Sequence, residues 1–132
     1  MGSHKTSLSG GALLRSALIA APGIAGRVTK IFPVAVAAAE LPYICYRRKA
    51  MQGDAVKAHP SDDTVLMEVM VCAADYDESV ALAEAARAAL DGNTWDDGDT
   101  GLRARRCTLA DASESFDADA YVQLLTFRIK IQ

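Results

Sequence analysis

The sequence predicts a single α+β domain over residues 1–132, with two helices packed on a roughly four-stranded, mainly antiparallel sheet in the order α-β-β-α-β-β. Residues 64–74 and the C-terminal segment 121–132 alternate apolar side chains with the period of a strand. Residues 75–91 instead have a helical period, with a capping residue before them and a glycine after them. A chain of 132 residues is also long enough to bury one core without metal or disulfide.

The stretch SLSGGALLRSALIAAPG, residues 7–23, predicts the first helix. Ser9 is suited to its N-cap, and Pro22 followed by Gly23 ends it. One apolar stripe follows the helical spacing and consists of Leu14, Ala17, Leu18 and Ala21. The next residues, 26–33, are expected to contribute at most a short extended piece.

Two strands are expected before the second helix. The first is YICYRRK, residues 43–49, and a polar loop over residues 50–63 follows it. The second, residues 64–74, is apolar on both faces, with Glu68 as its only charge. A strand of this kind needs cover on both sides, and in so small a domain the second cover could be another subunit.

The second helix, residues 75–91, has an unusually small apolar face. Asp75 can cap its first turn and Gly92 suits the left-handed position after its last. Its apolar residues are mostly alanines, which allow a helix to lie close to a sheet. An acidic, glycine-rich loop, NTWDDGDTG, then leads to a strand near residues 102–110 and to the half-buried C-terminal strand.

Composition argues against several classes of protein. The net charge of −3 is unlike that of a general nucleic-acid binder. Three cysteines, an odd number without a C-x-x-C pair, favour buried free thiols. No apolar run is long enough for a transmembrane helix, and a secretory signal is not favoured because Arg27 and Lys30 interrupt the apolar N-terminal region. We expect residues 1–7 to be an expression-tag remnant or to lie outside the folded domain.

No motif for catalysis, cofactor binding or metal binding is present. The loop from Asp91 fails as a calcium-binding EF-hand, because Trp95, Asp96 and Leu102 occupy positions that need an oxygen ligand, glycine and glutamate. A nucleophile pair between His59 and either Cys45 or Cys107 stays open, although nothing local marks it. We therefore expect no enzyme, no cofactor and no bound metal.

Charged clusters are the candidate contact surfaces. A solvated face or a protected sheet edge is the ordinary interpretation of such clusters. The functional one is a subunit or partner interface, in which basic clusters meet the acidic loop of another copy. The candidate residues are Arg47, Arg48, Lys49, Asp96, Asp97, Asp99, Arg103, Arg105 and Arg106.

Three segments together resemble a known family. They are LPYICYRR, then TVLMEVMVCAADYDESVALAEAARAALDG, and finally YVQLLTFRIKI. A Pro-Tyr strand, an apolar strand ending in a Tyr-Asp turn, an alanine-rich helix closed by glycine and a last strand around an aromatic residue follow one another over residues 8–132. This order is similar to that of the tail-completion, or tail-terminator, proteins of long-tailed bacteriophages and prophages, long catalogued as a domain of unknown function.

The resemblance implies a structural role without catalytic residues. It implies an α+β subunit that assembles into a ring, commonly a hexamer, at the head-proximal end of the tail tube. Such a ring stops tube growth and joins the tube to the head, so the implied partners are itself, the tail-tube protein and the head connector. It also implies a virion tail protein assembled in the bacterial host cytoplasm, with no membrane partner and no sequence-specific nucleic-acid binding.

Two other classes of function remain open on the residues alone. One is a small dimeric ligand-binding or regulatory α+β module without catalytic activity, and the other is an enzyme with an unrecognised site. An apolar pocket with converging polar groups would favour these two classes. A flat apolar patch with charged rims, repeated head to tail, would favour the ring.

Overall fold

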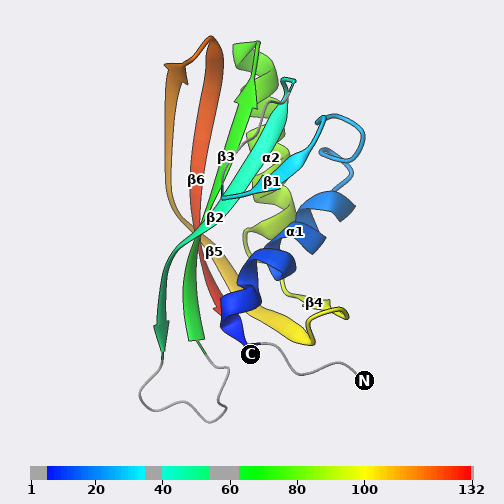
Figure 1. Cartoon of the computed structure of the whole chain (residues 1–132), viewed down its shortest axis with the longest axis vertical. Coiled ribbons are helices and arrows are strands. Elements are labelled where there is room, and N and C mark those ends of the chain that lie inside the picture. The colour runs from blue at the N-terminus through cyan, green and yellow to red at the C-terminus, as the bar shows by residue number, and fades with distance from the viewer. Residues whose placement is uncertain (1–5, 35–39, 54–62, 132) are drawn as a thin grey trace.

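Six strands form one sheet in the order β1-β2-β3-β6-β5-β4, and two helices cover one of its faces (Figure 1). The structure is a computed structural model that describes residues 6–34, 40–53 and 63–131. The elements in chain order are η1 (Ser7–Ser9), α1 (Gly10–Ala20), β1 (Ile31–Pro33), β2 (Tyr43–Gly53), β3 (Asp63–Ala73), α2 (Tyr76–Leu90), β4 (Trp95–Asp97), β5 (Leu102–Asp117) and β6 (Ala120–Ile131).

The predicted α+β class with two helices on a sheet is confirmed, but the predicted four strands and their order were wrong. The sheet is mixed, because β1 pairs with β2 in parallel while the other four pairings are antiparallel. The two additional strands, β1 and β4, have three residues each, too few to show a period in the sequence. Backbone hydrogen bonds hold β1 beside β2, among them one from the Val34 N–H to the Tyr46 carbonyl.

Strand β3 lies inside the sheet, between β2 and β6, and forms the centre of the core. Val69 and Val71 are fully buried, and α2 packs over β3 and β6, as the sequence predicts. On this face of β6, Phe127 and Ile129 are fully buried as well. Among the described residues, helices cover only this face, and on the opposite face of β3 Leu66 and Met70 are partly exposed (Figure 1).

Both predicted ends of α2 are confirmed. The Asp75 side chain accepts a hydrogen bond from the Glu78 N–H at 3.2 Å, and Gly92 adopts φ +78° after the last turn. Ala83 and Ala86 face the sheet and are buried. The same helix also meets the turn after α1, where a Cβ added to Gly23 would lie 2.6 Å from the Ala85 Cβ. Small side chains therefore allow α2 to pack closely against both the sheet and the turn after α1.

Asp91 ties the end of α2 to β5. One carboxylate oxygen accepts a hydrogen bond from the Leu109 N–H at 2.9 Å, and the other accepts one from Arg87 Nε at 3.1 Å. The backbone hydrogen bond, followed by that from Arg87, lowers the pKa of Asp91 below its usual value. The ionised carboxylate thus links the helix to the strand.

The start of α1 differs from the prediction. Ser9 occupies the N-cap but makes no side-chain capping hydrogen bond. Instead, a short 3-10 turn precedes the helix, and the Thr6 side chain caps that turn by accepting from the Leu8 N–H. Ser7 is fully buried, while residues 1–5 lie outside the described residues. No helix in the described part of the chain is long and apolar enough to cross a membrane.

Strands β5 and β6 form a hairpin that is longer than predicted. The sequence places the end of the first strand near residue 110, but β5 continues to Asp117. It does so because residues 111–117 pair with the apolar beginning of β6, whatever their own strand propensity. Ala118 and Asp119 make the two-residue turn with φ +49° and +63°, as a tight hairpin of the right-handed twist requires.

Gly23→Ala is expected to destabilise the fold by roughly 1–3 kcal/mol, because the new methyl group would overlap the Ala85 Cβ where two chain segments meet. Gly98→Ala is the matched control, since an added Cβ there meets nothing within 4 Å. Urea unfolding monitored by circular dichroism gives both free energies of unfolding. Equal stability of the two variants would contradict the close approach of α2 to this turn.

The Asp91→Asn variant is expected to be less stable than the wild type at pH 7, and this difference in stability is expected to disappear in acid. A lowered folded-state pKa means that the carboxylate stabilises the fold above the unfolded value of about 3.9, and that this stability is lost as the pH falls through the folded pKa. Free energies of unfolding of the variant and the wild type should therefore converge below about pH 4. A constant difference from pH 7 to pH 2 would argue against ionised Asp91 as the link.

Candidate assembly surfaces

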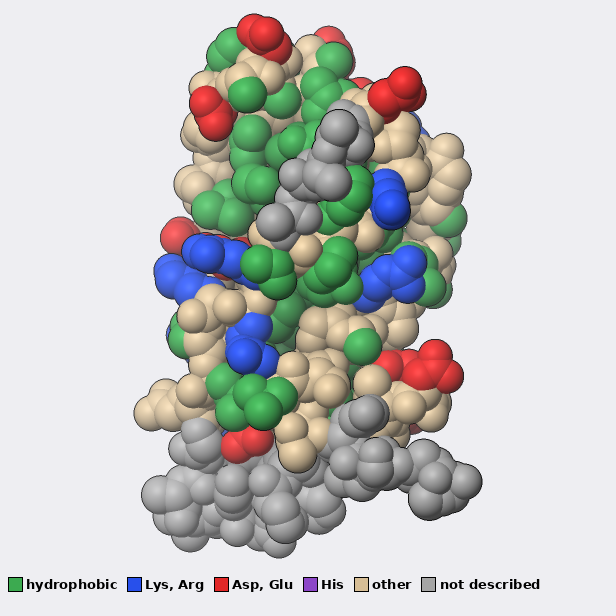
Figure 2. All heavy atoms as spheres, in the orientation of Figure 1, with side chains coloured by type: hydrophobic (Ala, Val, Ile, Leu, Met, Phe, Trp, Pro, Cys, Tyr) green, Lys and Arg blue, Asp and Glu red, His purple; other side chains and the backbone are tan. Residues whose placement is uncertain are grey.

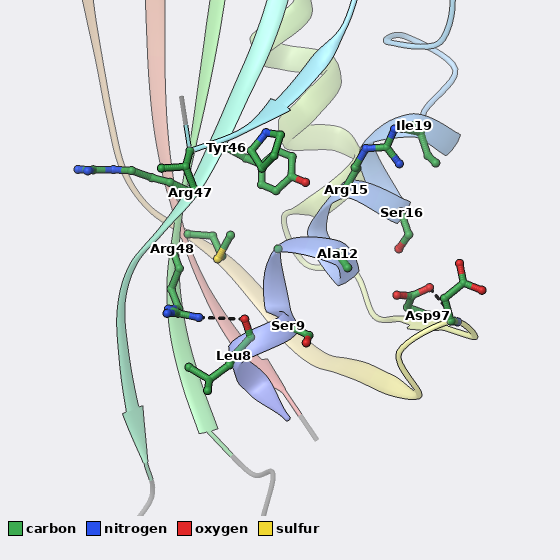
Figure 3. Close-up of a pocket in the computed structure, with 15 residues that line it drawn as sticks. Leu8, Ser9, Ala12, Arg15, Ser16, Ile19, Tyr46, Arg47, Arg48 and Asp97 are labelled. Atoms are coloured by element: carbon green, nitrogen blue, oxygen red, sulfur yellow. Dashed lines mark hydrogen bonds between the residues drawn. The ribbon is translucent and has the colours of Figure 1, made fainter. Parts of the chain in front are cut away.

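A groove of about 520 Å³ lies between α1 and the edge of β2 (Figure 3). We call it the α1–β2 groove. Its lining comes from segments that are far apart in the sequence: η1 with α1, the end of β1, the middle of β2, one residue of β3, and the end of β4 with the turn that follows it. The lining residues used below are Leu8, Arg15, Ile19, Val34, Tyr46, Arg48, Asp97 and Asp99.

Two hydrogen bonds between side chains and backbone hold the walls of the groove in place. Arg48 donates from Nη1 to the Leu8 carbonyl at 2.9 Å, which ties β2 to the start of the helical segment (Figure 3). The Trp95 indole N–H donates to the Leu13 carbonyl at 2.8 Å, which ties β4 to α1. Both walls are therefore attached to the folded domain.

The floor of the groove is the Tyr46 ring. A Cβ on Gly11 would lie 3.2 Å from this ring, so glycine lets α1 approach it closely. Burial raises the pKa of the Tyr46 phenol, while the nearby positive charge of Arg15 partly lowers it. The floor is thus an aromatic surface with a cation beside it.

Three large apolar side chains are exposed around the groove. Leu8 is 60% exposed, Ile19 47% and Val34 70%. Val34 also has φ +63°, an uncommon conformation for a β-branched residue. Figure 2 shows hydrophobic side chains along the middle of this face, with Lys and Arg side chains on both sides of them. Large exposed apolar side chains gathered at a groove are typical of a contact surface.

The structure brings part of the predicted basic cluster and part of the predicted acidic loop to this groove. Arg48 lies on one wall and the Asp97–Asp99 turn lies on the opposite one. Asp97 is used inside its own turn, since its carboxylate accepts from the Thr100 hydroxyl and the Asp99 N–H. Arg15, which the sequence analysis did not single out, adds a second cation.

Two more of the predicted basic residues have ion-pair partners within the chain, and one of these, Arg47, also lines the groove. Arg47 forms an ion pair with Glu68 on the face of the sheet away from the helices. Arg103 pairs with Asp96 at 3.6 Å across β4 and β5. Lys49 is exposed at an irregularity in the pairing of β2 with β3. The Asp96–Arg103 pair is thus made inside one subunit, where the sequence suggested a contact between copies.

A second hollow, of about 320 Å³, lies on the face of the sheet away from the helices. Three cationic side chains from β5 and β6 line it together with two threonines: Arg106, Arg128, Lys130, Thr64 and Thr108. Arg106 and Lys130 are cross-strand neighbours, and Arg105 precedes Arg106 in β5. This second basic surface includes part of the predicted cluster at residues 103–106.

The turn of the β5–β6 hairpin is acidic. No Lys or Arg occurs between Arg106 and Arg128 in the sequence. The carboxylates of this region are Asp111, Glu114, Asp117 and Asp119, and those of the adjacent α2 start are Asp75, Asp77 and Glu78. Figure 2 shows acidic side chains at this end of the molecule and basic ones nearer its middle. The lower half of this view has acidic side chains too, so negative charge is not confined to the hairpin end.

The thiols show no sign of activation. Cys45, Cys72 and Cys107 are buried and free. Burial raises all three pKa values, that of Cys107 to about 12. His59, the other member of the open Cys–His alternative, lies outside the described residues. Within the described residues no group of His, Cys, Asp and Glu is arranged to hold a metal ion.

Comparison with protein families gives a match over nearly the whole chain. Residues 12–132 match the family described as Tail completion protein gp17. The chain belongs to this tail-completion family. This confirms the resemblance in the sequence and makes the protein a structural component of a phage-like tail.

The fold of this tail-completion protein also occurs in a solved virion. A chain of the "Virion of native gene transfer agent (GTA) particle" superposes with a TM-score of 0.62 at 18% identity, covering 89% of this chain and 90% of that one. At this identity the likeness concerns the fold. Among curated protein sequences, none matches. Both the family and the particle are described in structural terms, and neither description is that of an enzyme.

Sequence reasoning missed the apolar part of the surface of this tail-completion protein. Leu8, Ile19 and Val34 are far apart in the sequence and meet at one groove only after folding. The residues next to each of them in the sequence do not indicate a contact surface, and Ile19 has the pattern of an ordinary helical residue. The acidic hairpin turn left a clearer signal, since the long run without a cation between Arg106 and Arg128 is visible in the sequence.

Alkylation of the native protein at pH 8 is expected to leave all three thiols unmodified, because burial keeps them protonated. Cys107→Ala should lower stability by about 1 kcal/mol, as a small core truncation does. Mass spectrometry before and after urea denaturation provides the measurement and its positive control. Rapid labelling of a single cysteine in the native state would reopen the enzyme alternative.

Proposed function

We propose that this tail-completion protein forms a closed ring at the head-proximal end of the tail tube. There it stops tube growth and joins the tube to the head. The observation that carries the proposal is the family match over residues 12–132. The ring, its hexameric size, assembly in the host cytoplasm, and contacts with the tail-tube protein and the head connector are parts of this proposal.

The surfaces of the subunit support a repeated contact. An exposed apolar groove with cations and an acidic hairpin turn are different surfaces of one molecule. When one patch meets a different patch on the neighbour, successive copies follow a rotation and can close into a ring. The second basic surface around Arg106, with Arg103 and Arg105 beside it, is a candidate contact with the tube or the connector.

The alternative is a dimeric ligand-binding module without catalytic activity. The volume of the α1–β2 groove, about 520 Å³, falls within the roughly 300–1,000 Å³ range of small-molecule sites. Tyr46 and two arginines could orient an anionic ligand there. The exposed apolar rim favours a protein contact over this alternative, because small-molecule sites bury most of their apolar lining.

The purified protein is expected to self-associate, alone at high concentration or on purified tail tubes, and to do so less as salt is added. The reason is that charges at contact rims are screened beyond about 10 Å at 0.1 M salt. Sedimentation velocity and light scattering between 0.05 and about 0.5 M salt measure the association.

Binding of the protein to tubes is measured by co-sedimentation, with tubes that already carry a bound terminator as the control. A protein that stays monomeric at every salt concentration and fails to bind tubes would refute the ring. Saturable binding of a small anion to such a monomer would support the ligand-binding module.

A further inference from the structure

The outer half of β5 has little support within the subunit. All residues from Ala110 to Asp117 are exposed. Strand β4 pairs only with Leu102–Ala104, so no described strand covers the outer edge of β5 beyond that point. Because β6 is itself paired with β3 as far as Tyr121, this part of β5 is an uncovered edge strand of the sheet, which offers its outer edge to another surface.

An aromatic side chain lies beside the turn of the β5–β6 hairpin. Phe116 is 60% exposed, yet its ring is held in an edge-on contact with Tyr121, with centroids 4.9 Å apart. Tyr121 in turn contacts Tyr76 at the start of α2. A large apolar ring fixed by its neighbours and still exposed loses little freedom when it binds, which is typical of an interface anchor.

The carboxylates around Phe116 divide into two groups. Glu114 is engaged inside the subunit, since it accepts hydrogen bonds from the Tyr76 hydroxyl and the Gln123 amide. Among the described residues, none forms an ion pair with Asp111, Asp117 or Asp119. Asp117 and Asp119 put negative charge beside the exposed Phe116 ring at the turn, whereas Asp111 lies farther back along β5, opposite Thr126.

The α1–β2 groove has the complementary features. Its rim offers the apolar side chains of Leu8, Ile19 and Val34 to an aromatic ring, and its floor is the Tyr46 ring. Arg15 and Arg48 supply positive charge, while the acidic Asp97–Asp99 turn on the far wall would repel carboxylates from that side. The groove therefore favours an acidic segment bearing an aromatic side chain, in one orientation.

The hairpin cannot fill the groove of its own subunit. The hairpin turn lies at one end of the long axis, whereas β4 and the start of α1, which supply two walls of the groove, lie in the other half (Figure 1). A β5–β6 hairpin turn that occupies this groove must therefore come from a second copy. Each copy would then give its hairpin to one neighbour and its groove to the other.

We propose that the β5–β6 hairpin turn of one subunit docks in the α1–β2 groove of the next, with Phe116 against the apolar rim and Asp117 near Arg15 and Arg48. This inference rests on the proposed ring and names its subunit contact. The competing explanation is that the hairpin carboxylates only protect an exposed strand edge from aggregation. In that case the groove plays no part in self-association.

A charge-swap experiment on the full chain separates these explanations. The groove variant is Arg15→Glu with Arg48→Glu, and the hairpin variant is Asp117→Lys with Asp119→Lys. Each alone puts like charges in contact and is expected to weaken self-association by about tenfold or more. An equimolar mixture should restore it, since each hairpin then meets a groove of opposite charge. The matched control, Ala81→Lys with Glu84→Lys on the exposed face of α2, should associate as the wild type does.

Sedimentation velocity measures association, and thermal melting confirms that each variant is folded. Cross-linking gives a second test: Phe116→Cys mixed with Ile19→Cys should form a disulfide-linked dimer, whereas Phe116→Cys mixed with Ala81→Cys should not. Native thiols do not interfere, because they are buried.

The outcomes of these tests separate the contact from the ring. Wild-type association that neither variant weakens would overturn the hairpin contact and leave the ring standing. A monomeric wild type that binds no tubes would overturn both. Impaired variants that fail to recover in the mixture would also exclude direct pairing of the two surfaces.

Discussion

The burial of β3 between β2, β6 and α2 is the contact on which the rest of the structure depends. Val69 and Val71 are fully buried under α2, and that helix can lie over them because Ala83 and Ala86 are small. The same helix reaches the turn after α1 through Ala85 and Gly23. One close helix–sheet contact therefore also determines where α1 lies, and with it one wall of the groove.

This arrangement concentrates the core on one face and leaves other surfaces for partners. Both helices lie on the same side of the sheet, so neither covers the outer half of β5 or the edge of β2 below β1. Assembly can supply the missing cover, and a subunit built this way gains stability from its neighbours. That suits a structural component of a phage-like tail, which acts within a larger particle.

Much of the frame follows from local patterns in the sequence. The period of β3, the Asp75 cap and the glycine at residue 92 are local signals, and each is found in the structure. Strand β4 was not predicted, and β1 only as a short extended piece within residues 26–33, since three residues have no period and the places of both strands depend on distant partners. The outer half of β5 is not recognisable as a strand in the sequence, because pairing with β6, rather than its own residues, makes it a strand.

For the candidate surfaces, charge clusters are visible in the sequence, whereas their ion pairs are not. Asp96 and Arg103, for example, meet only across two strands.

Phe116 and the α1–β2 groove are separate along the long axis of the subunit, and this separation affects how assembly ends. A self-complementary patch would pair two copies and stop, whereas two different patches on one subunit leave one of each unfilled until the chain of copies closes. In the proposed ring, unfilled ends would keep Phe116 and the rim of Leu8, Ile19 and Val34 in water, and closure would bury both at once. The last contact would therefore bury a full interface without the entropic cost of binding another free subunit. For that reason the proposed hairpin–groove contact favours closure over continued growth.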